Sequence, residues 1–170
     1  MSMGTAVETA KSPRQLVSEL PDPEMPWVTL GDLGIVRSVE CGSDRTVRVE
    51  LSPTYLGCPA IDAMRADVAT VLEDAGYRVE SVGLRLDPPW TPASISEEGR
   101  RKLAEAGIAP PAHVASPQQG SDSAVPLSLG VRCPHCGSVE TTLLSRFGAS
   151  PCQELRRCAS CAEPFPAVRS

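Results

Sequence analysis

Two pairs of cysteines near the C-terminus restrict the fold of this 170-residue chain more than any other feature. Cys133 and Cys136 form one C-x2-C pair and Cys158 and Cys161 form another, with 21 residues between the pairs. Each pair can form a tight turn that directs two thiolates at one ion, and four thiolates complete a tetrahedral shell with no open position. The spacing predicts a small ribbon with a structural zinc ion, whose binding free energy folds about 40 residues that have little hydrophobic core.

Other readings of the same cysteines remain open at this point. The four cysteines could be unpaired thiols in an ordinary fold. They could also include a redox-active C-x-x-C pair, although that chemistry would not require two such pairs. Iron in the same sulfur cage, or a labile iron–sulfur cluster, has the same ligand type as zinc. His135 lies inside the first turn, and we expect it to face solvent instead of binding the metal.

A proline-rich stretch divides the chain into two unequal parts. Residues 109–127 contain four prolines, several small polar residues and no Lys or Arg. Such a segment buries too little apolar surface to offset its ordering entropy, so it is predicted to be a linker. The expected organisation is a flexible N-terminus at 1–12, a domain at 13–108, the linker at 109–127 and the zinc ribbon at 128–170.

The larger part has the pattern of a small α+β domain with a β-β-α-β order and flanking helices. Apolar residues alternate with charged ones near residue 48, and they recur at helical spacing between residues 61 and 72. Pro59 suits the first position of that central helix, and Gly76 suits the left-handed position just past its end. The core must rely mainly on Leu, Val, Ile and Ala, because only 4% of the residues are aromatic. The expected elements are, in order, a helix at 14–20, strands at 35–41 and 45–51, a helix at 59–75, a strand at 77–86 and a helix at 96–106.

Cys58 lies between the second strand and the central helix. A thiol at a helix N-terminus feels the positive end of the helix dipole, which favours the thiolate and makes the sulfur a better nucleophile or soft-metal ligand. The alternative is a buried thiol that acts only as a small hydrophobic side chain. Cys41 is expected to be structural, and Cys152 a spare or simply packed thiol.

Composition limits the classes of function. The net charge of -5 disfavours a partner that is held through phosphate contacts, so no nucleic-acid partner is expected, although four arginines of the ribbon leave a nucleic-acid-binding module as a third alternative. No apolar stretch is long enough for a membrane span or a signal peptide, which predicts a cytoplasmic protein. Only two histidines and no glycine-rich phosphate loop are present, so an autonomous enzyme is not expected.

Seven segments, in this order, resemble the PaaD family of phenylacetate-degradation proteins. The segments are DPEMPWVTLGDLGIV, PTYLGCPAIDAM, DPPWTP, ISEEGRRKLAEAGIAPP, CPHCGS, SRFG and CAEPF. The part before the linker resembles the SufT and MIP-type domains of iron–sulfur cluster assembly. The match extends from about residue 20 to 168, and the combination of segments is specific although each one alone is not.

The resemblance implies an accessory role in maturing the iron–sulfur centre of a phenylacetyl-CoA monooxygenase (epoxidase), with the iron–sulfur reductase component as the principal partner. It implies a site at Thr54, Cys58 and Pro59, supported by the acidic motif of Asp22 and Glu24. A transient iron–sulfur cluster at Cys58 would need further ligands from a second chain, from Cys41, from a carboxylate or from a small thiol, and the first of these would make the protein a homodimer. The alternative role is a structural subunit of the oxygenase complex.

Overall fold

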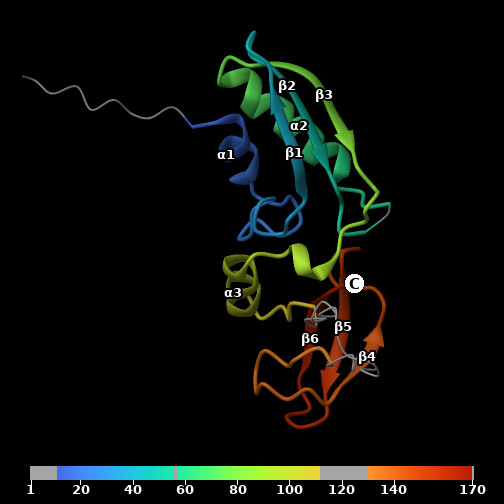
Figure 1. Cartoon of the computed structure of the whole chain (residues 1–170). Helices are drawn as coiled ribbons and strands as arrows, with labels where there is room; N and C mark the ends of the chain where they lie inside the picture. The colour runs from blue at the N-terminus through green and yellow to red at the C-terminus, as the bar shows by residue number, and fades with distance from the viewer. Residues whose placement is uncertain (1–10, 56, 112–129, 170) are drawn as a thin grey trace, which may run out of the picture.

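The structure is a computed structural model that describes residues 11–55, 57–111 and 130–169. Its elements form two small sheets, one above the other, with α3 and a short 3-10 helix between them (Figure 1). This is the α+β architecture expected from the sequence. In chain order the elements are α1 (Pro13–Ser18), β1 (Val36–Cys41), β2 (Thr46–Leu51), α2 (Ile61–Asp74), β3 (Arg78–Leu84), η1 (Pro92–Ser94), α3 (Glu97–Glu105), β4 (Thr141–Ser145), β5 (Gln153–Cys158) and β6 (Pro164–Val168).

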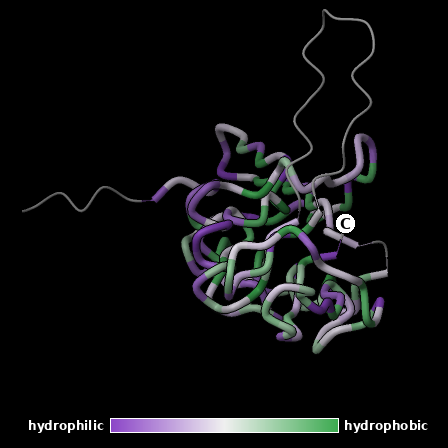
Figure 2. Tube along the Cα trace, turned by 90° about the horizontal axis from the view of Figure 1, so that it is seen from below, coloured by the Kyte–Doolittle hydropathy of each residue, from purple (hydrophilic) through white to green (hydrophobic). Residues whose placement is uncertain are grey.

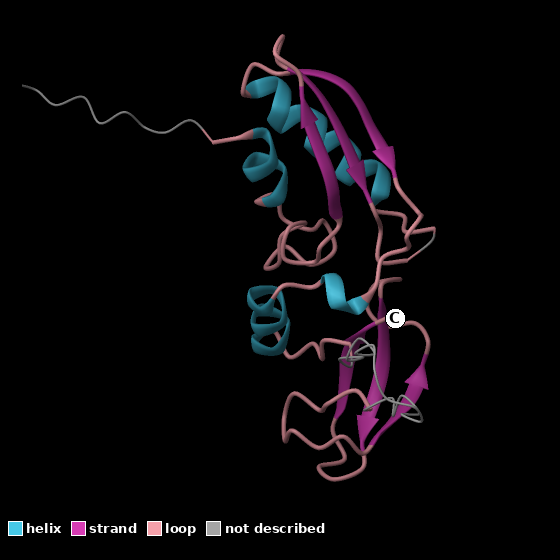
Figure 3. Ribbon diagram, viewed as in Figure 1, coloured by secondary structure: helices cyan, strands magenta, loops and turns pink. Residues whose placement is uncertain are grey.

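The first sheet has the order β1-β2-β3 and confirms the predicted β-β-α-β arrangement. β1 and β2 form an antiparallel hairpin, and β3 returns parallel to β2 after α2. α2 covers one face of the sheet (Figure 3), and its buried residues Met64, Val68 and Leu72 recur at the spacing of one helix face. Gly76 follows α2 with φ of 78°, as predicted.

α2 starts two residues later than predicted. Ala60 is its N-cap residue, and Pro59 is exposed in the preceding turn. The reason is local, because the Cys58 N–H donates to the Tyr55 carbonyl at 3.2 Å and the Ile61 N–H donates to the Cys58 carbonyl at 3.3 Å. These turn hydrogen bonds hold the chain out of helical geometry until Ala60.

The loop between α1 and β1 is held in place by contacts with residues near α3. Gly34 has φ of 67°, and a Cβ built on it would lie 2.1 Å from the carbonyl oxygen of Ser94. The Trp90 indole N–H donates to the Leu33 carbonyl at 2.8 Å. This loop carries Asp22 and Glu24, so contacts near α3 position the acidic motif.

The second sheet has the order β4-β5-β6 with antiparallel neighbours. Its last strand, β6, packs against the residues that follow α3. Ala109, predicted to begin the linker, is buried and pairs with Ala167 of β6. Its N–H donates to the Pro166 carbonyl, and its own carbonyl accepts from the Val168 N–H, both at 2.9 Å. The rest of the predicted linker, from residue 112, lies outside the described residues.

One buried core crosses the boundary between the two parts. Val168 and Cys152 from the second sheet belong to the same apolar cluster as Cys58 and Trp90 from the first part. Most of this cluster is Val, Leu and Ile, as the low aromatic content predicted. Figure 2 shows hydrophobic and hydrophilic stretches interleaved along the chain in the view from below. A second cluster around Phe165 includes Cys133 and Cys158.

At the other end of the chain, the predicted flexible N-terminus of 1–12 lies outside the described residues up to residue 10. Ser12 is ordered as the N-cap of α1 and forms a capping box with Gln15.

Asp32 joins the α1–β1 loop to α3. Its Oδ2 accepts hydrogen bonds from the Lys102 ammonium at 2.7 Å and from the Thr29 N–H at 3.0 Å. Burial raises the pKa of Asp32, but the bonds from Lys102 and Thr29 outweigh burial and hold this pKa below its usual value.

Replacing Asp32 by asparagine should destabilise the protein by about 1–3 kcal/mol at pH 7, since a charge-assisted hydrogen bond at a nearly buried site is lost. A lowered folded-state pKa means that the carboxylate stabilises the fold above the unfolded-state value near 3.8 and loses this contribution as pH falls through the folded-state value. Urea denaturation of wild type and Asp32→Asn should therefore show a constant gap from pH 7 to about 5, and a closing gap in stronger acid. Asp62→Asn, at an exposed pair with Arg65, is the control and should change stability by less than about 0.5 kcal/mol. A gap for Asp32→Asn that does not depend on pH would contradict this account.

Candidate metal centre and buried thiols

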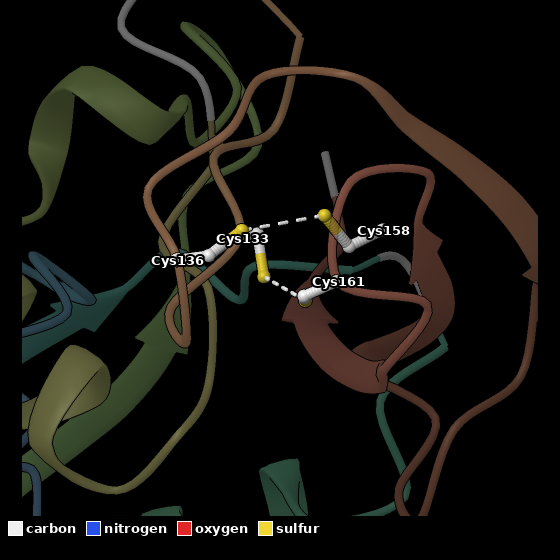
Figure 4. Close-up of side chains that lie close together, drawn as sticks. All are labelled: Cys133, Cys136, Cys158 and Cys161. Carbon is white, nitrogen blue, oxygen red and sulfur yellow. Dashed lines mark hydrogen bonds between the residues drawn. The ribbon is translucent and has the colours of Figure 1, made fainter.

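Four sulfur atoms from two turns of the ribbon converge on one point. Cys133 and Cys136 lie in the turn before β4, whereas Cys158 is the last residue of β5 and Cys161 lies in the turn that follows it. In Figure 4 the side chains of the two turns point toward each other. Gly137, with φ of 76°, closes the first turn, where the Cys133 N–H donates to the Ser138 carbonyl at 2.8 Å. Within the described residues, these four cysteines are the group of possible ligands whose atoms come together.

The sulfur separations fit a tetrahedral metal ion. All four sulfurs lie within 4.8 Å of one another, with 3.8 Å between Cys133 and Cys161 and 3.5 Å between Cys136 and Cys158. A zinc–sulfur bond of about 2.3 Å in a tetrahedron places the sulfurs about 3.8 Å apart. The cage is therefore of the size that one zinc ion needs.

The pKa values of the thiols in this cage are shifted in opposite directions. N–H groups of Cys161 and Ser160, with Cys136, outweigh burial and lower the pKa of Cys158 to about 6. At Cys161 the N–H of Glu163 favours the thiolate, yet burial and the neighbouring thiols raise the pKa to about 12. Four thiolates at these distances repel one another unless a cation lies between them, and a bound metal ion deprotonates its thiols outright.

His135 is exposed, as expected for a residue that is not a ligand. Three of the four arginines that suggested nucleic-acid binding contact the protein itself. The Arg156 Nε pairs with the Glu154 carboxylate at 2.7 Å, and the Arg157 Nε donates to the Ala162 carbonyl at 3.1 Å. Arg169 lies over the ring of Tyr55, 4.4 Å from its centroid.

Cys58 lies in the turn before α2 and is 8% exposed. Burial raises the pKa of this thiol, the N–H groups of Ala60 and Ile61 lower it, and the charges of Asp22 and Glu24 raise it further. The net shift is upward. The prediction of a thiolate stabilised by the helix N-terminus is wrong, because desolvation by the surrounding core outweighs the N–H groups.

The structure brings the acidic motif to Cys58. Asp22 is 3% exposed, and its Oδ1 accepts hydrogen bonds from the N–H groups of Glu24 at 2.9 Å and Met25 at 2.8 Å. Within the described chain, Oδ2 of Asp22 accepts no hydrogen bond. Burial raises the pKa of Asp22 more than the two N–H groups lower it. The Glu24 side chain is exposed beside this carboxylate.

Thr54 and Pro59 belong to the same turn but not to this group of side chains. Thr54 lines a cavity of about 180 Å³ with Ser52 and Trp90. Pro59 is exposed, and Cys41 is exposed at the end of β1.

Cys152 is a packed thiol, which is one of the two roles expected from the sequence. It is 6% exposed, and its sulfur lies 2.9 Å from the Ser150 hydroxyl. Burial raises the pKa of Cys152, the Ser150 hydroxyl lowers it, and the charges of Asp22, Cys58 and Glu24 raise it further. Cys58 and Cys152 are 94 positions apart in the chain, and no spacing pattern relates them.

The fold and the sites together define a two-part protein, in which a small α+β domain precedes a four-cysteine ribbon. Residues 14–83 match the family described as iron-sulfur cluster assembly protein, and residues 117–169 match the PaaD zinc beta ribbon domain. A protein of Escherichia coli (strain K12), provisionally named as a subunit of 1,2-phenylacetyl-CoA epoxidase, is 41% identical over 150 residues, which cover 88% of this chain and 86% of that protein. The chain belongs to the PaaD family, as its sequence segments predicted.

A second relative aligns with part of the chain. An Fe-S protein maturation auxiliary factor of Porphyromonas gingivalis is 35% identical over 83 residues, covering 48% of this chain and 78% of that protein. Among solved structures, a domain of unknown function (DUF59) from Bacillus anthracis is 24% identical with a TM-score of 0.49, covering 54% of this chain and 87% of that one. A conserved hypothetical protein from Thermotoga maritima is 26% identical with a TM-score of 0.46, and the alignment covers 61% of this chain and 98% of that one. None of the helices in the described ranges has the length and apolar character that crossing a membrane requires.

Proposed function

We propose that this protein is a non-catalytic accessory component of a phenylacetyl-CoA oxygenase (epoxidase) system, and that it matures or inserts the iron–sulfur centre of that system. The observation that carries the proposal is the buried Cys58 in the turn before α2, on a domain that matches iron–sulfur assembly proteins. The relative named as an epoxidase subunit indicates which system is served. The iron–sulfur reductase component is the client whose chemistry fits best.

The chemistry of the Cys58 turn suits a carrier. A soft thiolate is the usual ligand of iron–sulfur clusters. Burial keeps the empty thiol protonated and shielded, so it resists oxidation until a cation replaces its proton. On binding, the S–H proton leaves to water and the sulfur electron pair forms the bond to iron. On transfer this bond breaks with its electron pair returning to sulfur, while a client thiolate takes over the iron without a change of oxidation state.

The chain offers few side chains for the acid–base chemistry of an independent catalyst. His113 and His135 are its only histidines, and His135 is exposed on the ribbon. The buried acids of the described residues are committed to structure, because Asp32 pairs with Lys102 and Asp22 accepts two backbone N–H groups. A catalytic acid–base pair needs groups that are free to exchange protons with substrate.

We assign zinc to the ribbon, where Cys133, Cys136, Cys158 and Cys161 would hold it. A closed four-thiolate site leaves no position for substrate, so this ion would be structural. The ribbon would then present a rigid surface for docking to oxygenase components.

Metal and sulfide analysis of anaerobically purified protein tests the carrier role. Wild type reconstituted with iron and sulfide should hold both, with the visible absorption of an iron–sulfur cluster, in addition to one zinc per chain. Cys58→Ala should lose the iron, the sulfide and the absorption and keep the zinc. Cys41→Ala, which removes an exposed thiol, is the matched control and should resemble wild type. Wild type that holds only zinc after reconstitution would exclude the carrier role.

A structural subunit of the oxygenase complex is the second candidate, favoured by the name of the Escherichia coli relative. The two roles differ in stoichiometry. A structural subunit copurifies with the catalytic subunits in a fixed ratio, whereas a maturation factor is substoichiometric and dispensable once the reductase holds its cluster.

A further inference from the structure

The outer strand of the second sheet has an apolar, uncharged surface. β4 lies at the edge of this sheet, with β5 on one side of it (Figure 1). The strand, Thr141–Ser145, contains no charged residue and no proline, although these residues commonly protect an edge strand from pairing with another chain. Its leucines, Leu143 and Leu144, and the flanking Val139 and Phe147 are between 42% and 66% exposed. Exposed apolar side chains that gather in one place indicate an interaction surface.

The backbone of β4 can pair with a further strand at Leu143. The Ala159 N–H donates to the Glu140 carbonyl at 2.8 Å, so the backbone of Glu140 faces the β5 side. In an antiparallel pair the backbone groups of successive residues alternate between the two sides of the strand. This alternation directs the groups of Thr142 toward β5 and those of Leu143 outward. The register with β5 shifts between Leu143 and Ser145, and at this bulge the two consecutive leucines are both exposed.

The residues on the two sides of Leu143 complement one another. Glu140 lies three positions before Leu143 and Arg146 lies three positions after it, while Val139 and Phe147 lie four positions before and after it. If two copies of the strand pair antiparallel about Leu143, each Glu140 lies opposite an Arg146, and each Val139 lies on the side of a Phe147. Opposite charges and apolar pairs facing each other across strands stabilise a sheet. The same surface on both copies is the requirement for a two-fold symmetric interface.

The side chains that such a pairing needs are available. Glu140 and Arg146 are both exposed, and neither forms an ion pair within the described residues. The segment after β4 is held in place, because the Ser145 hydroxyl accepts the Phe147 N–H at 3.1 Å and donates to the Phe147 carbonyl at 2.9 Å. A surface that is ordered before binding loses less conformational entropy when the partner arrives.

We propose that β4 is the interface of a homodimer, in which Leu143 pairs antiparallel with Leu143 of a second copy. The two three-stranded ribbon sheets then form one continuous sheet across the two copies. Charge complementarity identifies a second copy as the partner, since a strand with the opposite order of charges is needed and β4 itself supplies it. The interface uses none of the four cysteines of the metal cage, and it is independent of the proposed carrier function.

Charge reversal tests this pairing. Glu140→Arg places two arginines opposite each other at both ends of the interface, and Arg146→Glu places two carboxylates there. Each single variant should dimerise at least about tenfold more weakly than wild type, because like charges that face each other across an interface are costly. In an equal mixture of the two variants, one of them fluorescently labelled, opposite charges face each other again. The mixture should form a heterodimer, and the double variant Glu140→Arg/Arg146→Glu should form a homodimer as wild type does.

Sedimentation velocity over a range of protein concentrations measures the monomer–dimer equilibrium. Asp67→Arg makes the same change of charge on the exposed face of α2 and should dimerise like wild type. An unchanged metal content verifies that the ribbon of each variant is folded. A wild type that stays monomeric at every concentration overturns the proposal, whatever other protein binds β4. Single variants that dimerise like wild type, or a mixture that does not associate, overturn the pairing about Leu143.

Discussion

Replacing Cys133 by serine should remove the metal from the ribbon and unfold β4, β5 and β6. Cys133 is almost fully buried beside Phe165, and it is one of four ligands in a cage that fits zinc. Binding of structural zinc to four such ligands is worth about 10–16 kcal/mol, more than the total stability of most domains. The zinc content measured by elemental analysis should fall from one zinc per chain to none. Hydrogen exchange should show that the backbone amides of all three strands lose their protection.

His135→Ala is the matched control for this experiment. It changes the same turn by one residue that is two positions from Cys133 and exposed to solvent. The variant should keep its zinc and its protected strands. A Cys133→Ser protein that retains one zinc per chain would mean that the cage is not the metal site, and a metal-free protein with protected strands would mean that the metal is not required for the fold.

Gly34→Ala should destabilise the first part by about 4 kcal/mol. The positive φ of 67° costs an L-residue about 1–2 kcal/mol, and the new Cβ would meet the Ser94 carbonyl oxygen at 2.1 Å, where backbone has to move. The displaced loop carries Asp22, so iron binding at Cys58 should weaken as well. Denaturant unfolding followed by circular dichroism measures the stability.

Gly107→Ala separates the destabilisation caused by the positive φ from that caused by the close approach to Ser94. Gly107 has φ of 73°, but a Cβ at this position has no atom within 4 Å. This variant should lose only the stability that the positive φ accounts for, about 1–2 kcal/mol. Equal losses for Gly34→Ala and Gly107→Ala would show that the close approach to Ser94 does not matter.

Local patterns predicted the elements and the metal cage. The apolar spacing of Met64, Val68 and Leu72 depends only on the helical repeat, and the two cysteine pairs form turns whose geometry is determined within a few residues. The site at Cys58 supported by Asp22 came from resemblance to a family and stays a prediction, although the charge of Asp22 acts on the pKa of Cys58.

The remaining features depend on contacts between residues that are distant in the sequence. Asp32 and Lys102 are 70 positions apart, and Ala109 pairs with Ala167 across most of the ribbon. The pKa of Cys58 was predicted in the wrong direction, since the apolar cluster that desolvates it includes Val168 of the ribbon. Sequence spacing contains no information on which distant segment covers a thiol.

Because the two parts share one core, binding of a metal ion in the ribbon also affects the first part. Free energy gained by binding a ligand stabilises the whole cooperative structure to which the binding site belongs. Val168 and Cys152 extend the ribbon into the core that surrounds Cys58, so an ion bound in the ribbon would also stabilise the surroundings of the proposed carrier thiol. With zinc as that ion, a shortage of zinc would reduce the fraction of chains able to handle iron, and the supply of one metal would control the use of another.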